Sequence, residues 1–145
     1  MRRVNRSSLV IYSAEQMFDL VNDVEAYPKF LPGCTGASVD EHGEGWMLAT
    51  VKLSKGSMNH AFTTRNTLTK PSAIDLSLVG GPFETLSGGW RFVQLGEEGS
   101  KVSLELDFQF ENRLVDMMFG SFFEDLCNSL VDAFTRRADV IYRNE

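Results

Sequence analysis

Apolar and polar residues alternate without a break between Val102 and Phe110. An alternation of period two buries one face of a strand and exposes the other, which is typical of an antiparallel sheet. Weaker strand patterns precede this segment, and turns at 41–45, 55–57, 70–72 and 96–99 separate them. They cover residues 3–12, 35–40, 46–54, 58–69, 74–78 and 86–95. The pattern therefore predicts about seven strands in one antiparallel sheet.

Helical patterns lie after the first strand and again at the end of the chain. Ser13 and Gln16 have the spacing of a capping box, and Asp23 is placed to begin a second short helix that ends near Tyr27-Pro28. From about Arg113 to Arg143, apolar residues recur at steps of three and four, which predicts one long helix.

These elements predict an α+β fold in which a strongly curved antiparallel sheet wraps around the long C-terminal helix. Two short helices follow the first strand, and the long helix alone can cover the apolar face of the sheet. The pairs Gly80-Gly81 and Gly88-Gly89 suit bends or bulges in such a sheet. The length of 145 residues and the lack of a linker or repeat predict a single domain over residues 1–145.

The opening of the long helix is more apolar than a core-facing helix requires. Between Leu114 and Phe123 the apolar side chains cover more than half of the helix circumference, whereas packing on a sheet needs an arc of roughly 100–160°. Either the sheet wraps far around the helix, or the excess forms the wall or mouth of an apolar cavity. Met and Phe suit the second alternative because both adapt to irregular ligands.

Polar residues also interrupt an apolar strand face. His60, Thr64 and Asn66 are in phase with Phe62, whereas Arg65 lies on the opposite, solvated face. A filled core tolerates such residues only when each has a hydrogen-bond partner. Backbone groups or buried water supply one explanation, and a cavity that holds a ligand with a polar head supplies the other.

The segment from Tyr27 to Pro32 holds aromatic residues between two prolines. Pro28 and Pro32 predict a rigid turn that exposes apolar side chains. Such a connector sits where a lid or entrance would be in a cup built from a helix and a sheet. The alternative is a structural plug that closes the open end of the sheet.

Composition narrows the choice of function. The chain is 43% hydrophobic and 23% charged, and its net charge of −6 disfavours DNA binding and generic affinity for nucleic acid. Cys34 and Cys127 are far apart and are expected to be reduced cytosolic thiols. Neither a signal peptide nor a run of roughly 18 apolar residues is found, so we expect a cytoplasmic protein without a transmembrane segment.

No catalytic chemistry is predicted. His42 and His60 lack partners at metal-ligand spacing, no nucleophile motif occurs, and the glycine pairs do not form a phosphate-binding loop. An enzyme would need an acid–base pair inside the cup, whereas the strand phase places the nearby carboxylates outside. These carboxylates are Asp75, Glu105 and Asp107.

Several segments together resemble the coenzyme Q-binding branch of the START-like (polyketide cyclase and lipid transport) superfamily. They are Tyr12–Cys34, Phe62–Asn66, Gly81–Phe83, Leu86–Phe92, Phe119–Phe123 and Ala133–Ala138. Within that branch the chain is similar to the bacterial ribosome-association toxins. One departure is Gly33, because many relatives carry an aromatic residue after the second proline of the Tyr-Pro motif.

The resemblance implies a helix-grip fold with a deep hydrophobic cavity between the sheet and the long helix. It implies binding of ubiquinone or a similar prenyl lipid in support of respiration, with no catalysis, no required cofactor and peripheral contact with membranes. It also implies an alternative, a toxin–antitoxin role in which the protein binds the large ribosomal subunit and blocks its joining with the small one. The basic residues available for that partner are Arg2, Arg3 and Arg6, or Lys52 and Lys55 beside a turn.

We therefore predict a ligand site built from both layers of the fold. The entrance consists of Tyr27, Phe30 and Leu31, and the polar contacts are Thr64 or Asn66. The walls are apolar residues of the sheet and the long helix: Phe62, Leu78, Trp90, Phe92, Phe108, Phe119, Phe122, Phe123 and Leu126. Burial of an isoprenoid tail at about 25 cal/mol per Å² would supply affinity without a charged anchor.

Overall fold

The computed structural model describes residues 1–143 of the chain. Seven strands form one sheet in the order β1-β7-β6-β5-β4-β3-β2, and every neighbouring pair is antiparallel. The strands are β1 (Arg2–Val10), β2 (Cys34–Gly43), β3 (Trp46–Lys55), β4 (Met58–Thr69), β5 (Ala73–Gly80), β6 (Phe83–Leu95) and β7 (Gly99–Phe110). The predicted antiparallel sheet is confirmed.

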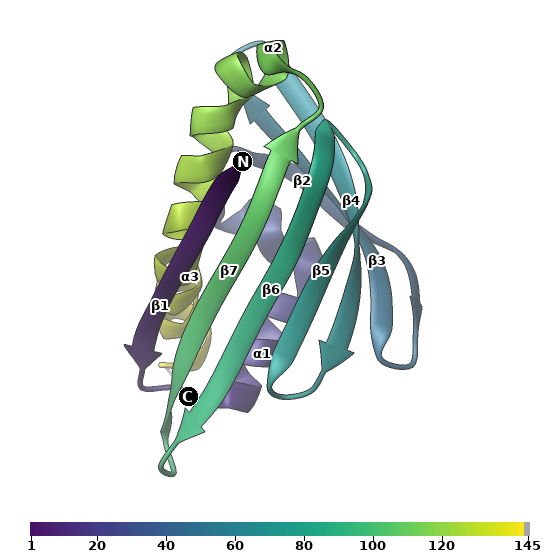
Figure 1. Cartoon of the computed structure of the whole chain (residues 1–145). Helices are drawn as coiled ribbons and strands as arrows, with labels where there is room; N and C mark the ends of the chain where they lie inside the picture. Colours follow the sequence, from purple (N-terminus) through teal and green to yellow (C-terminus); the bar gives the residue numbers. More distant parts are fainter. Residues whose placement is uncertain (144–145) are drawn as a thin grey trace.

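The helices lie together on one side of this curved sheet (Figure 1). They are α1 (Ala14–Asn22), the 3₁₀-helix η1 (Val24–Lys29), the short α2 (Arg113–Val115), the π-helical turn η2 (Asp116–Gly120) and the long α3 (Ser121–Tyr142). Figure 1 shows the sheet curling around α3, with α1 on the same side. This is the architecture that the sequence predicts.

The first helix begins where the sequence places it. The Ser13 hydroxyl accepts a hydrogen bond from the Gln16 backbone N–H at 3.1 Å, and the Gln16 side chain accepts one from the Ser13 N–H at 2.9 Å. This reciprocal capping box satisfies two of the free donors at the helix start. Asp23 precedes η1 as expected, but its side chain makes no capping hydrogen bond. Asp23 therefore occupies the predicted helix start without a side-chain cap.

The predicted long C-terminal helix is confirmed over residues 113–142, but it is not α-helical throughout. At η2 the backbone forms a π-helical turn, which inserts one extra residue and shifts the helix face. Gly120 ends this turn under the Arg2 guanidinium, where an added Cβ would lie 2.7 Å from Arg2 Nη2. The turn buries Phe119 and leaves Met117 and Met118 exposed.

Glycine permits the close approach of strands that curves the sheet. Gly88 has a φ of 137°, and an added Cβ would lie 2.0 Å from the Glu105 carbonyl oxygen on β7. A residue with a side chain cannot occupy this position without moving the backbone. Gly88 therefore allows the close β6–β7 contact at this point, whereas the register irregularity of this pair lies at Phe83/Thr85.

Candidate functional site

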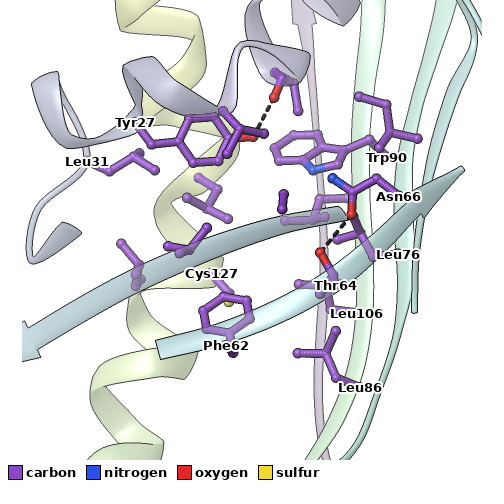
Figure 2. Close-up of a pocket in the computed structure, with 18 of the residues that line it drawn as sticks. Tyr27, Leu31, Phe62, Thr64, Asn66, Leu76, Leu86, Trp90, Leu106 and Cys127 are labelled. Atoms are coloured by element: carbon purple, nitrogen blue, oxygen red, sulfur yellow. Dashed lines mark hydrogen bonds between the residues drawn. The ribbon is translucent and has the colours of Figure 1, made fainter. Parts of the chain in front are cut away.

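A cavity of about 100 Å³ lies between α3, the α1–η1 segment and the concave face of the sheet. Figure 2 shows its lining residues, which come from both layers of the fold. Most of the surrounding side chains are aliphatic or aromatic, including the indole of Trp90, and the exceptions are Asn22, Tyr27, Thr64, Asn66 and Cys127. This composition suits a mostly apolar occupant with few polar groups.

The structure brings together many of the residues predicted for the ligand site. Those that line the cavity are Tyr27, Leu31, Phe62, Thr64, Asn66, Trp90, Phe123 and Leu126. Both predicted polar residues of β4 face the cavity and are only 6% exposed, because β4 turns them inward in phase with Phe62.

The remaining predicted residues lie outside the cavity lining, and for those on strands the reason is that strand phase indicates the face of a sheet but not the position along it. Phe92 packs between Trp90 and Phe18 of α1, and Phe108 is enclosed by Phe83, Phe110 and Phe123. The other four are outside the lining as well: Phe30, Leu78, Phe119 and Phe122.

Other lining residues were missed by the sequence reading. Val21, Asn22 and Val24 enter from the end of α1 and the start of η1, and Cys127, Leu130 and Phe134 extend the wall along α3. The helical spacing of Cys127, Leu130 and Phe134 with Leu126 could have identified the α3 group. Asn22 carries no sequence signal, because an asparagine at the end of a helix is ordinary.

The polar groups of the cavity are few and specifically arranged. The Thr64 hydroxyl donates a hydrogen bond to Asn66 Oδ1 at 2.7 Å. The Asn66 amide nitrogen has no acceptor among residues 1–143, and Figure 2 shows it on the side of the cavity where Trp90 lies. Asn22 Oδ1 is buried and has no hydrogen-bond partner in the same part of the chain. The residues that line the cavity thus include one with an unpaired donor and one with an unpaired acceptor.

The segment from Tyr27 to Gly33 closes one side of the cavity. The Tyr27 hydroxyl donates a hydrogen bond to the Val21 carbonyl, and burial raises the pKa of the Tyr27 phenol well above its usual value. The rings of Tyr27 and Phe30 lie 5.4 Å and 5.2 Å from that of Phe134, and the Arg137 guanidinium lies 5.2 Å from the Phe30 ring. We call residues 27–33 the closing segment.

This packing corrects the expectation that the two prolines expose apolar side chains. Leu31 is only 7% exposed, and Tyr27 and Phe30 are half-buried. Gly33 has a φ of 78°, and an added Cβ would lie 2.7 Å from Phe122 Cζ. The positive φ favours glycine at this position, and any side chain would have to displace the Phe122 ring, so an aromatic residue does not fit here without a shift.

The two cysteines are unpaired and buried. Burial raises the pKa of the Cys127 thiol well above its usual value and also raises that of Cys34. A raised pKa reduces the thiolate fraction at neutral pH and makes the thiol unreactive. Cys127 lines the cavity, which makes it a probe of access to this space.

The excess apolar surface at the opening of the long helix is taken up neither by the sheet nor by the cavity. Leu114, Met117 and Met118 are 64%, 74% and 56% exposed. The sheet therefore does not cover these three side chains, and they are not among the residues that line the cavity. Phe119 and Phe123, which follow these residues along the helix, are buried in the hydrophobic core.

The N-terminal arginines are engaged within the chain. Arg2 forms ion pairs with Asp116 at 2.8 Å and Glu124 at 2.9 Å, Arg3 pairs with Asp107 at 2.6 Å, and Arg6 donates to Asn128 Oδ1 at 3.0 Å. Lys52 and Lys55 are exposed and make no ion pair within the described residues. The lysines thus present the freer positive charge.

The predicted outer-face carboxylates lie outside the cavity. Asp75 pairs with Arg91 at 2.8 Å, and Asp107 pairs with Arg3. Arg65 also lies on the outer face, but its guanidinium stacks over the Trp46 ring at 4.4 Å rather than being fully solvated. No carboxylate or imidazole is among the cavity-lining residues of the described chain.

In residues 1–143 no helix has the length and apolar character needed to cross a bilayer.

Comparison with known proteins defines the class of protein. The family described as polyketide cyclase / dehydrase and lipid transport matches residues 10–135, so the chain belongs to this family. The aromatase/cyclase Zhui from Streptomyces sp. R1128 has the same fold, with a TM-score of 0.83 over 98% of this chain and 97% of that one at 18% identity. The predicted START-like, helix-grip fold is confirmed.

Two relatives are more specific. The chain is 51% identical to the ribosome association toxin RatA of Vibrio cholerae, over 98% of this chain and 99% of the toxin. It is 29% identical to the mitochondrial coenzyme Q-binding protein COQ10 of Drosophila melanogaster, over 92% of this chain and 57% of that protein. The predicted family resemblance is therefore confirmed, and the two names correspond to two different functions.

Proposed function

We propose that this protein binds a prenylated quinone or similar prenyl lipid in its cavity without converting it chemically. The observation that carries the proposal is the apolar cavity with the Thr64–Asn66 pair in its wall. Thr64 fixes the Asn66 amide, so that its nitrogen is free to donate to a carbonyl oxygen. The relative named for binding coenzyme Q supports this ligand class.

The size of the cavity requires that it opens for such a ligand. The volume is about 100 Å³, whereas a cavity that holds benzene measures roughly 150 Å³. A substituted quinone ring with a prenyl tail is larger than benzene, so part of the wall must move. The strands are held by continuous hydrogen-bond ladders. The closing segment is held mainly by aromatic contacts, by the Tyr27 hydroxyl bond to the Val21 carbonyl and by the Ser54 N–H bond to the Gly33 carbonyl of 2.8 Å. We propose that the closing segment is the gate.

Ligand identity is tested on the purified protein. Native mass spectrometry followed by lipid extraction is expected to show a co-purifying prenylated quinone or to show binding of added decyl-ubiquinone. Thr64→Val is expected to weaken binding of decyl-ubiquinone about five- to tenfold, because the Asn66 amide loses the hydrogen bond that orients it. Thr67→Val, an exposed position on the same strand, is the matched control and is expected to leave binding unchanged. The absence of any quinone binding would refute the proposal.

A second function rests on a separate observation, the 51% identity over nearly the whole chain to a protein named ribosome association toxin. We propose that the chain also associates with the large ribosomal subunit and blocks its joining with the small one, thereby inhibiting translation. Lys52 and Lys55 carry the contact with phosphate in this proposal, because the N-terminal arginines are already paired within the chain.

This second function is tested by cosedimentation with isolated large subunits. Binding is expected to fall steeply as salt rises, since each phosphate contact releases counterions. Lys52→Glu combined with Lys55→Glu is expected to abolish cosedimentation, whereas Lys101→Glu, a single exposed lysine on β7, is expected to have a small effect. Cosedimentation that resists both salt and charge reversal would eliminate the lysine contact.

A further inference from the structure

Asn22, the last residue of α1, lines the cavity and carries a buried acceptor that no donor in residues 1–143 uses. Its Oδ1 atom is inaccessible to solvent and has no donor among residues 1–143. A buried polar atom without a partner destabilises the fold by roughly the cost of a lost hydrogen bond. Such an atom in the wall of a binding cavity indicates a ligand group that donates to it.

The two free polar groups of the cavity have opposite chemistry. Asn66 Oδ1 already accepts one hydrogen bond from Thr64, whereas the Asn66 amide hydrogens have no acceptor among residues 1–143 and are free to donate to a ligand. Asn22 Oδ1 can only accept. The Tyr27 hydroxyl does not supply the missing donor, because it donates to the Val21 carbonyl instead.

This pair of groups discriminates between the oxidation states of a quinone. The ring oxygens of an oxidised quinone only accept hydrogen bonds, so they can satisfy Asn66 but leave Asn22 unpaired. A hydroquinone accepts from Asn66 through one oxygen and donates an O–H to Asn22 through another. We infer that the cavity binds the reduced, hydroxyl-bearing form of its prenylated ligand more tightly than the oxidised form, and that Asn22 is the residue that distinguishes them. This inference rests on the proposed quinone-binding function.

The position of Asn22 also relates the head group to the gate. Asn22 follows Val21 directly, and the Val21 carbonyl is the group that anchors Tyr27 of the closing segment. A hydroxyl bound at Asn22 therefore lies beside the anchor of the gate. The ligand ring would occupy the end of the cavity under the closing segment, with its tail among the leucine and phenylalanine side chains along α3.

The experiment compares decyl-ubiquinone, its reduced quinol and the dimethyl ether of that quinol under anaerobic conditions. The wild-type protein is expected to bind the quinol about five- to tenfold more tightly than the quinone, the effect of one additional hydrogen bond. The dimethyl ether keeps the aromatic ring of the quinol but carries a methyl group in place of each O–H hydrogen, so it has no donor and is expected to bind no more tightly than the quinone. Asn22→Leu is expected to remove the preference while retaining quinone binding, and Asn5→Leu, an exposed position on β1, is expected to keep it.

The ether comparison keeps the test valid even where Asn22→Leu fails to fold. Equal or tighter binding of the oxidised quinone by the wild-type protein would overturn the inference while leaving quinone binding intact. That result would mean that a water molecule satisfies Asn22 or that the amide presents its nitrogen to the ligand. Failure of all three compounds to bind would instead overturn the proposed function.

Discussion

Truncation of Phe30 tests whether the closing segment is a gate. Phe30→Ala removes a half-buried ring that packs 5.2 Å from the Phe134 ring and 6.2 Å from the Tyr27 ring, and that lies under the Arg137 guanidinium. Truncation of a fully buried phenylalanine costs about 3–5 kcal/mol, so we expect about 2 kcal/mol for this half-buried ring. Since 1.4 kcal/mol corresponds to a factor of ten, local opening of the segment is expected to rise about 30-fold.

Amide hydrogen exchange measures this opening directly. The Leu31 N–H donates to the Tyr27 carbonyl at 2.9 Å and the Cys34 N–H to the Leu31 carbonyl at 3.2 Å, so both report on the closing segment. In Phe30→Ala these amides are expected to exchange about 30-fold faster, with β7 amides changing much less. Trp46→Ala is the matched control, because it also removes a half-buried aromatic ring from beneath an arginine, but on the outer face of the sheet. Equal acceleration in the segment and in β7 would show that the segment is a permanent plug.

Three further results are expected. In a Cys34→Ser background, Cys127 is expected to react slowly with a thiol reagent; the labelling rate is expected to rise when Phe30→Ala is added and to fall when decyl-ubiquinone is saturating. A labelling rate that neither change affects would show that the gate does not control access to the cavity. Gly33→Ala is expected to lower the free energy of unfolding, measured in urea, by more than Gly56→Ala does, because both glycines have a positive φ but only Gly33 lies against Phe122. Equal decreases in the free energy of unfolding would contradict the packing argument. The hydrogen bond from Arg2 lowers the pKa of Asp116, so the stability that this pair adds is present above pH 4 and is lost as pH falls through the lowered pKa; at such an exposed site it is at most about 1 kcal/mol. A difference in unfolding free energy between wild type and Asp116→Asn that persists at lower pH would refute this assignment.

The fold was predictable because its strongest signals are local. The alternation from Val102 to Phe110 sets the two faces of β7, and all five apolar positions are buried as predicted. The capping box at Ser13 depends on two residues in one turn, and it forms as predicted. The π-helical turn was not predictable from the apolar spacing, and the residue packed against it, Arg2, lies at the other end of the sequence, where it pairs with Asp116 and contacts Gly120.

The candidate site was predictable only in part, because a cavity is defined by depth as well as by face. Trp90 and Phe92 share the inner face of β6, yet Trp90 lines the cavity while Phe92 packs on Phe18 of α1. The two-residue spacing cannot distinguish them without knowledge of where α1 crosses the sheet. Asn22 was missed for the same reason, since its role follows from the tertiary position of the helix end.

The most direct test of the central claim, that the cavity opens to accept a quinone, is a titration observed at Trp90. The chain has two tryptophans, and Trp46→Phe leaves Trp90 of the cavity wall as the sole indole. Addition of decyl-ubiquinone to this variant is expected to quench Trp90 fluorescence in a saturable manner with a stoichiometry of one per chain, and Phe30→Ala is expected to speed the approach to saturation. Quenching that is linear and non-saturable, or that is the same for unfolded protein, would contradict a quinone site in this cavity.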